Sequence, residues 1–304
     1  MKKYLPEGRI YQEEHKGQYT LAQVTDAMNT GKILESRVLL CDVEHNLHVD
    51  MGSVRGIIPR EQGAIGISDG SVKDIALISK VNKPVCFKVC ELRTDVYGNQ
   101  IAYLSRLEAQ LECKNEYVSK LRPGDIVDAK ITHMEHFGAF VDIGCGINAL
   151  IPIDMISISR IPHPSERFEE NQDIRAVVKN IDDGRITLSH RELLGTWEEN
   201  ARLFQAGETV PGVIRSIEDY GIFVELTPNL AGLAELAENV RLSERACVYI
   251  KSIIPERMKL KLVIVDSFED SYNDKGLNYF IEESHIDYWR YSPENCSRVI
   301  ETLF

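Results

Sequence analysis

The sequence lacks several features that would place it in well-known classes of protein. It has no apolar run of about 18 residues, so we expect no membrane-spanning helix. Its first residues, from Met1 to Glu7, carry two lysines with no apolar stretch behind them, so we expect no secretory signal. Its 7 cysteines are an odd number and form no regular framework. Free thiols are typical of a reducing compartment, and the sequence therefore predicts a cytoplasmic protein.

Motifs that carry enzymatic chemistry are also missing. There is no phosphate-binding P-loop, no G-x-S-x-G nucleophile turn and no paired acid/base signature. His45 with His48 and His133 with His136 are spaced as H-x-x-H, but on a strand such histidines diverge, and no partner stands at ligand spacing. We therefore expect a non-catalytic protein without cofactor or metal.

Positive charge is scarce as well. The net charge is −12, from 35 basic and 47 acidic side chains, which argues against a nucleic-acid binder that uses its whole surface. The acidic excess is concentrated in residues 119–200, which hold 9 basic and 14 acidic side chains, and in residues 267–304, which hold 3 and 8. Any basic patch must therefore be local.

What the chain does have is an internal repeat. Three stretches share one pattern, Glu44–Gly52, Glu135–Gly144 and Glu218–Leu226, and each is followed by two further matching segments. The matching segments are 56–59, 149–152 and 232–235, then 101–105, 185–189 and 258–262. Each unit reads as four or five short alternating strands within about 70 residues, which predicts a small closed barrel rather than one flat sheet.

Helical patterns separate the repeats. Ser105 and Ser189 each precede a Glu by three residues, which is the capping-box pattern of a helix start. Aromatic residues are enriched in the last segment, where Ser292-Pro293 predicts the start of a helix that runs through Leu303. We expect this tail to pack on the third barrel. The predicted organisation is an N-terminal helical segment (1–30), a degenerate barrel (31–106), a helical connector (107–121), a second barrel (122–191), a second connector (192–206), a third barrel (207–266) and an acidic aromatic extension (267–304).

Residues 122–191 resemble the S1 RNA-binding domain. The resemblance rests on Pro123–Val127, on Phe137-Gly138-Ala139-Phe140-Val141-Asp142, and on Ile181–Ser189. Residues 207–265 are similar to this domain in their first part and less similar toward their end, and residues 31–106 are weakly similar to it. The whole chain resembles the short, multi-repeat ribosomal protein S1-like proteins of low-GC Gram-positive bacteria. The resemblance implies a mainly β fold of three tandem OB-fold barrels, joined by short helices, with an N-terminal helix and a C-terminal helical, aromatic tail.

The resemblance also implies an RNA-binding set of two aromatics, a histidine, an aspartate and a basic residue. In the middle barrel these positions hold Phe137, Phe140, Pro152, Asp182 and Arg185, so the histidine is replaced. In the third barrel they hold Tyr220, Phe223, Glu235, Pro255 and Lys259. In the first barrel the aromatic positions hold His45 and His48 and the histidine position holds Pro59, so this barrel departs most.

The paired rings have a physical reading of their own. Residues three apart on a strand normally face opposite sides, so we expect Gly138 and Gly221 to permit a bulge that brings both rings of a pair to one face. Exposed rings would stack unpaired bases, at about 1–3 kcal/mol per base. The alternative is that all four rings belong to the core.

Local cations complete the predicted surface. Arg185 and Lys259 precede the last strand of their barrels, where they could meet a phosphate or a base. Weaker candidates for RNA contact are Lys130, Lys179, Arg191 and Lys261. For each of these, an ordinary solvated charge is the competing interpretation.

Two functions remain open at this stage. The first is non-catalytic binding of single-stranded RNA, which the resemblance sets in translation, with messenger RNA held at or near the small ribosomal subunit. The second is a protein-interaction adaptor whose acidic middle barrel and tail dock to a ribosomal or RNA-processing partner. In either case a mainly structural role is open for the first barrel, and the sequence does not predict an oligomeric state.

Overall fold

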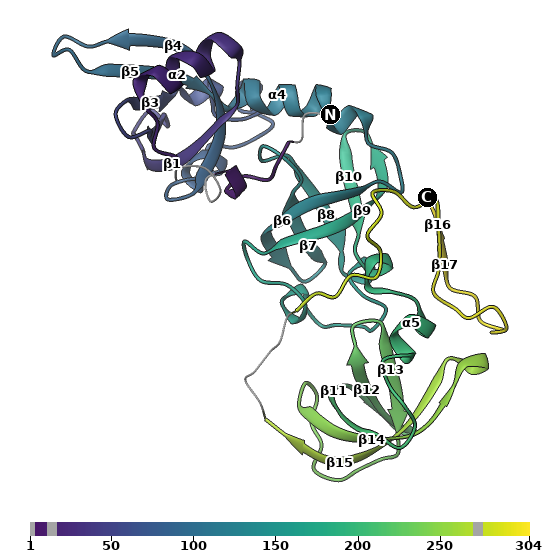
Figure 1. Cartoon of the computed structure of the whole chain (residues 1–304). Coiled ribbons are helices and arrows are strands. Elements are labelled where there is room, and N and C mark those ends of the chain that lie inside the picture. The colour runs from purple at the N-terminus through teal and green to yellow at the C-terminus, as the bar shows by residue number, and fades with distance from the viewer. Residues whose placement is uncertain (1–3, 11–16, 270–275) are drawn as a thin grey trace. The chain divides into compact units, whose positions relative to one another are not determined.

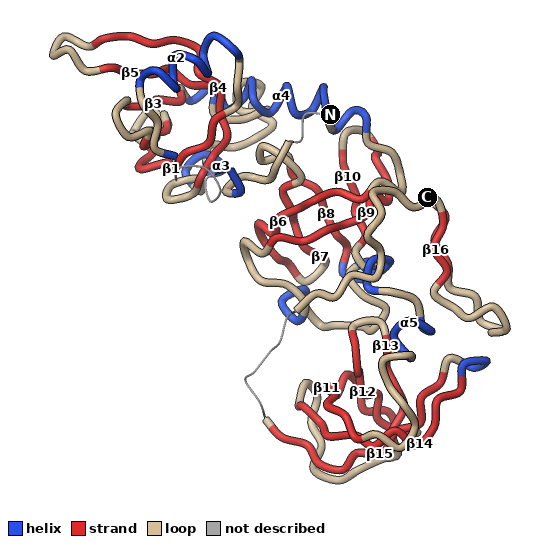
Figure 2. The backbone as a smooth tube through the Cα atoms, viewed as in Figure 1, coloured by secondary structure: helices blue, strands red, loops and turns tan. Residues whose placement is uncertain are grey.

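Strands with alternating apolar residues close into three five-stranded β-barrels, as the sequence predicts (Figure 1). A computed structural model describes residues 4–10, 17–269 and 276–304. Strands dominate the backbone and helices are short (Figure 2). Within these described ranges, none of the helices has the length and apolar character needed to traverse a lipid bilayer.

The three barrels share one strand order. In each, the first strand pairs with the second and the fourth, and the third pairs with the fifth in parallel. The first barrel comprises β1 (Leu34–Cys41), β2 (Leu47–Asp50), β3 (Arg55–Ile58), β4 (Pro84–Thr94) and β5 (Gln100–Ser105). The second comprises β6 (Ile126–Glu135), β7 (Gly138–Asp142), β8 (Asn148–Pro152), β9 (Asp173–Asp182) and β10 (Arg185–Ser189). The third comprises β11 (Thr209–Glu218), β12 (Gly221–Thr227), β13 (Leu230–Ala234), β14 (Arg245–Ile254) and β15 (Lys259–Phe268).

Alternation divides each strand between a core face and an outer face. On β12, Ile222 and Val224 are fully buried, while Phe223 between them points outward and is half-buried. On β7, Ala139 and Val141 flank Phe140 in the same way. The inward residues fill the barrel and the outward residues are available for contacts with a ligand.

Two of the predicted helical regions behave differently. Ser105 caps α4 (Arg106–Glu116) by accepting a 2.9 Å hydrogen bond from the Glu108 amide, as its sequence pattern predicts. The second connector is not one helix. It is a 3₁₀ turn (Arg191–Leu194) followed by the short α5 (Trp197–Ala201), because Gly195 between them has φ +84° and ends the helical path.

The remaining helical segments are brief. Helix α2 (Leu21–Thr30) is capped at both ends, by a capping box at Thr20 and by a left-handed Gly31. Helix α3 (Ile75–Ile78) lies between β3 and β4. Further single 3₁₀ turns occupy Arg60–Gln62, Val118–Lys120, Ile153–Met155, Pro164–Glu166 and Pro255–Arg257.

The described chain divides into two compact units. The first contains residues 1–121, 128–130 and 142–148, and the second contains the rest of the chain. The second unit therefore holds most of the second barrel, the whole third barrel and the C-terminal extension.

The C-terminal extension packs on the third barrel, as expected, but it is not helical. Trp289 and Tyr291 join the buried cluster of that barrel. The predicted helix from Ser292 is wrong, because β16 (Tyr288–Arg290) pairs with β17 (Glu301–Leu303) as an antiparallel hairpin. The Ser292 hydroxyl does accept a backbone hydrogen bond, but it comes from Ile300 across the hairpin, at 2.8 Å. The part of the extension at 270–275 lies outside the described residues.

A buried histidine joins the extension to the second barrel. The His190 ring lies against Phe168 and Tyr279, with its Nδ1 3.1 Å from the Ile156 carbonyl and its Nε2 3.2 Å from the Tyr279 hydroxyl. The Tyr279 oxygen in turn accepts a 3.0 Å hydrogen bond from the Arg175 amide. A neutral ring fits this chain, with Nδ1–H donating to Ile156 and Nε2 accepting from Tyr279. Burial, together with the nearby Arg167 charge, lowers the pKa of His190 to about 4.

This arrangement predicts an acid-sensitive second unit. Between about pH 6.5 and pH 4, unfolded His190 binds a proton and the folded ring does not, so acid favours the unfolded chain. The free energy of unfolding should fall by up to roughly 3 kcal/mol from this group as the pH drops through that window. Denaturant unfolding of the wild type and of His190→Gln across the window should show the difference between them narrowing toward acid. Parallel pH profiles for the two proteins would contradict the assignment.

A candidate nucleic-acid interface

The second barrel presents two aromatic rings beside each other. Phe137 lies in the turn between β6 and β7 and is 56% exposed, and Phe140 lies half-buried on the outer face of β7. Their ring centroids are 5.9 Å apart with an angle of 89° between the planes. The rings therefore form one edge-to-face platform on the surface.

The third barrel repeats this platform. Tyr220 lies in the turn between β11 and β12 and is 69% exposed, and Phe223 lies half-buried on β12. Their centroids are 6.1 Å apart at 88°. Neither pair belongs to the barrel core, so the interpretation of all four rings as core residues is wrong.

The rings share a face for a different reason from the expected bulge. The first ring of each pair is in the two-residue turn rather than on the strand, so strand alternation does not separate it from the second. The glycines serve another purpose. A Cβ at Gly138 would stand 2.4 Å from the Ile151 carbonyl oxygen, and one at Gly221 would stand 2.5 Å from that of Ala234. Only glycine permits this approach of neighbouring strands beside the rings.

Strand register defines which residues accompany the rings. In the third barrel, paired positions run across all five strands on the outer face. This central row consists of Ser216, Phe223, Leu233, Lys261 and Ser252. Lys261, a weaker candidate from the sequence, is exposed and lies two strands from Phe223, with the partly exposed Leu233 between them. A base on Phe223 would therefore have an apolar neighbour and a cation in the same row.

The second barrel has a residue that the sequence analysis missed. The His133 ring is 57% exposed on the side-chain scale and stacks on Phe140, with centroids 6.4 Å apart and planes 16° apart. Its Nε2 lies 2.7 Å from a Glu135 carboxylate oxygen. The sequence could have indicated this residue, because counting back from Phe140 across the two-residue turn places His133 opposite it on β6. This ring extends the aromatic platform to three members.

The two predicted cations are the first residues of the last strand of their barrels, rather than preceding it. Arg185 opens β10, is exposed, and stands opposite Asp182, which ends β9. Lys259 opens β15 and is also exposed. These three residues remain candidates for contact with phosphate or base edges.

Three weaker candidates are engaged elsewhere. Lys130 is buried, because its side chain lies against Gly8, so it does not face solvent. The Lys179 ammonium lies 5.1 Å above the Phe304 ring, and Arg191 donates to the Thr302 hydroxyl at 3.4 Å. The C-terminal hairpin thus occupies both side chains, and we remove all three residues from the RNA-binding set.

The first barrel carries no ring pair at the corresponding positions. His48 lies 3.1 Å from Asp42, and His45 lies 3.6 Å from Asp74. Partial burial opposes ionisation of Asp42, but hydrogen bonds from His48 and Asn46 bring its pKa down to about 2. The two histidines therefore face carboxylates, which suits ion pairing better than base stacking.

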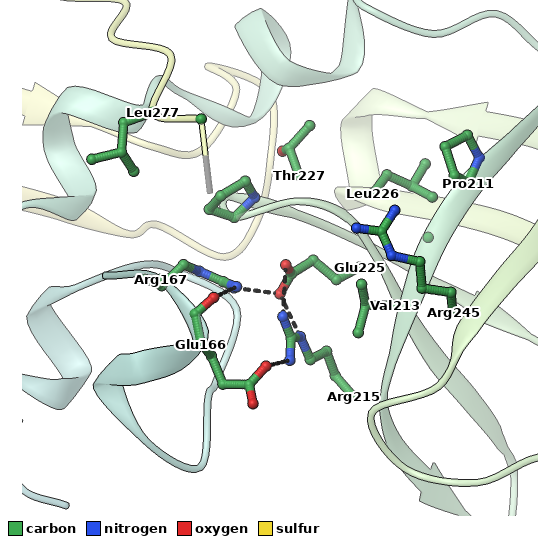
Figure 3. A pocket seen from close by; sticks show the side chains of 13 residues that line it. Glu166, Arg167, Pro211, Val213, Arg215, Glu225, Leu226, Thr227, Arg245 and Leu277 are labelled. Carbon is green, nitrogen blue, oxygen red and sulfur yellow. Dashed lines mark hydrogen bonds and ion pairs between the residues drawn. The ribbon is translucent and has the colours of Figure 1, made fainter. Parts of the chain in front are cut away.

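A charged pocket lies beside the third barrel within the second unit (Figure 3). Its volume is about 200 Å³, and Arg167, Arg215 and Glu225 line it. The Glu225 carboxylate accepts from Arg215 at 2.9 Å and from Arg167 at 2.5 Å, and Arg215 also donates to Glu166 at 2.9 Å. Since these charges neutralise one another, the network fixes the loop at 166–167 to β11 and β12. Across the described ranges, no cluster of three or more His, Cys, Asp or Glu side chains is arranged to hold a metal ion.

Comparisons with known proteins agree with the geometry. Residues 120–191 match the S1 RNA binding domain family. Two curated relatives are named "Small ribosomal subunit protein bS1 homolog": one from Bacillus cereus is 28% identical, covering 75% of this chain and 62% of its own length, and one from Bacillus subtilis is 29% identical, covering 75% and 58%. The resemblance to S1-type proteins is therefore confirmed. The chain spans about three fifths of the length of these relatives.

A solved structure is also similar. It is a multidomain protein with nucleic acid binding domains from Streptococcus pneumoniae, 15% identical, covering 80% of this chain and 76% of that chain with a TM-score of 0.26.

The close strand approach at Gly138 gives a test of how the rings are supported. Gly138→Ala places a methyl group against the Ile151 carbonyl and forces β7 from β8, at a cost of about 1–3 kcal/mol. Denaturant unfolding should show this loss, and the Ile153 amide, which donates to the Phe137 carbonyl at 2.9 Å, should exchange its hydrogen faster. Asn148→Ala, at an exposed position of β8, is the control and should cost less. Wild-type stability and wild-type exchange in Gly138→Ala would contradict this account.

Proposed function

We propose that the chain is a non-catalytic protein that binds single-stranded RNA on the outer faces of its second and third barrels. The observation that carries the proposal is the repeated edge-to-face ring pair, with Phe137 and Tyr220 exposed at the same turn of two barrels. Adjacent exposed rings form an apolar patch, and contiguous apolar patches mark binding surfaces more often than single exposed residues do. Every nucleobase has a flat face that fits such a ring, with little dependence on sequence.

The bound strand would meet different groups along each barrel. Bases stack on Phe137 and Phe140 in the second barrel and on Tyr220 and Phe223 in the third. Arg185, Lys259 and Lys261 stand at the last strand, where they neutralise phosphates, and Asp182 accepts hydrogen bonds from base edges. The overall negative charge of −12 then limits non-specific attraction to the few local cations.

The setting that fits best is translation in the cytoplasm. The match of residues 120–191 to the S1 RNA binding domain and the bS1 names of the relatives support messenger RNA as the strand and the small ribosomal subunit as the place. The chain spans only about three fifths of the length of those relatives. We therefore propose ribosome association separately from RNA binding, and either one can hold without the other.

The adaptor hypothesis receives less support. Its docking surface was the acidic middle barrel together with the tail, but Trp289 and Tyr291 of the tail are buried in the third-barrel cluster, and Tyr279 is bound to His190. These three aromatic side chains therefore make their contacts within the chain. The acidic surface of the middle barrel remains exposed to a partner, and truncation of the exposed rings separates the two functions.

Truncating the two exposed rings tests the proposal directly. Phe137→Ala with Tyr220→Ala should weaken binding of a fluorescent single-stranded RNA by about 30-fold or more, since each stacked base is worth about 1–3 kcal/mol. Folding should be retained, because exposed side chains contribute little to stability. Fluorescence anisotropy measures affinity, and thermal unfolding checks the fold.

Tyr288→Ala is the matched control, because Tyr288 is a 49% exposed aromatic on the C-terminal hairpin. It should bind RNA as the wild type does. Unchanged affinity in a well-folded Phe137→Ala, Tyr220→Ala protein would show that base stacking at these rings is wrong, and would favour the adaptor hypothesis.

A further inference from the structure

The first barrel carries an aromatic residue on the same outer row, but on a different strand. Strand register defines its central row, as it does in the third barrel, by the pairs Leu40 with His48, His48 with Ile57, Ile57 with Tyr103, and Tyr103 with Glu91. Both barrels also have register shifts at matching places, at Val38/Leu40 and Ile214/Ser216 and at Val89/Glu91 and Ile250/Ser252. The two rows therefore correspond residue by residue.

The correspondence shows where the ring has moved. His48 takes the place of Phe223, and Tyr103 takes the place of Lys261. The first barrel thus has its ring on β5 rather than β2, two strands across the same face. A search for aromatics at the β2 positions overlooks it.

An arginine covers this ring with its own flat group. The Arg93 guanidinium carbon lies 4.7 Å from the centroid of the Tyr103 ring. Glu91 holds the guanidinium by two hydrogen bonds, from Nε at 2.7 Å and from Nη2 at 2.8 Å. The Arg93 side chain is still 59% exposed. A guanidinium fixed in this way offers a flat surface on which a base can stack.

The adjacent row on the same face is basic. Register places Arg37 opposite Asp50, Asp50 opposite Arg55, Arg55 opposite Ile101, and Ile101 opposite Arg93. We call this set the arginine row: Arg37, Asp50, Arg55, Ile101 and Arg93. Its three arginines are all exposed, although the Nε of Arg37 donates to the Asn82 carbonyl at 3.2 Å. Asp50 accepts a hydrogen bond from the Gly52 amide at 3.1 Å. The positive charge of Arg55 also contributes to lowering the pKa of the nearby Asp95 carboxyl.

The charge of the whole barrel agrees with this local pattern. Residues 31–106 hold 10 basic and 9 acidic side chains, against 8 and 11 for residues 122–191 and 7 and 9 for residues 207–266. The excess of one in the first count is Arg106, which opens α4 and pairs with Glu7, so the first barrel itself is neutral where the other two are acidic. A phosphodiester backbone is the ligand that a row of exposed arginines beside a flat stacking group suits best.

We propose that the outer face of the first barrel is a third binding site for single-stranded RNA, in which a base stacks on Arg93 above Tyr103 and phosphates contact the arginine row. This site extends the proposed function to a barrel that lacks the ring pair, and it uses basic and aromatic residues on β1, β3, β4 and β5 in place of the rings on β2. The rings of the other two barrels take no part in it.

The test uses the full chain and a fluorescent uridine-rich single-stranded RNA. Arg55→Gln with Arg93→Gln should weaken binding about fivefold or more, and should lower the steepness of the salt dependence by about 0.7 for each phosphate that the variant no longer neutralises. Lys73→Gln with Lys114→Gln is the matched control, because both lysines are exposed in the same unit but away from the two rows. The control should bind as the wild type does.

Combining variants separates this site from the proposed function. In the Phe137→Ala, Tyr220→Ala background, the arginine changes should remove most of the remaining affinity, and RNA carrying 4-thiouridine should cross-link to residues 84–105 in the wild type. If the ring variant loses affinity while the arginine variant behaves like the control and no such cross-link forms, the third site is wrong and the proposed function stands. If the arginine variant alone loses affinity, the third site stands and stacking on the other barrels is wrong.

Discussion

Closure of five strands into a barrel is the constraint on which the surface of this protein depends. Because every second side chain of each strand fills the closed core, the side chains between them face outward. Register then aligns them in rows across the barrel. The row of Ser216, Phe223, Leu233, Lys261 and Ser252 exists because Ile222, Val224 and Leu262 fill the interior beside it. Position on the binding face is therefore a by-product of burial.

The same constraint lets the three barrels differ without losing their fold. Outward residues contribute little to the core, so Phe223, His48 and their counterparts can change while the strands stay paired. The second barrel gains His133 beside Phe140, the third gains Lys261, and the first exchanges its ring pair for Tyr103 and Arg93. RNA bound at any of the three faces would meet flat groups, but supplied by different strands.

Much of the fold and of the candidate site could be predicted from the sequence, because the three repeats show both the alternation along each strand and the positions that are buried. The three barrels follow from the pattern alone, and so do the ring positions and the cap at Ser105. The predicted bulge at Gly138 is wrong, since whether Phe137 lies on a strand or in a turn depends on where pairing between β6 and β7 stops. Lys130, Lys179 and Arg191 were misplaced because segments distant in sequence cover them. The C-terminal hairpin was missed because Ser292 and Pro293 satisfy a helix start locally, while pairing with residues 301–303 and packing of Trp289 decide the structure.

The central claim is that nucleobases lie against the exposed rings, and aromatic NMR on the full chain with ¹³C-labelled phenylalanine and tyrosine measures it most directly. On titration with single-stranded RNA, the ring signals of Phe137, Phe140, Tyr220 and Phe223 should move upfield and saturate together, while that of Tyr288 stays in place. Saturable binding of the RNA that leaves all four ring signals unmoved would contradict the account.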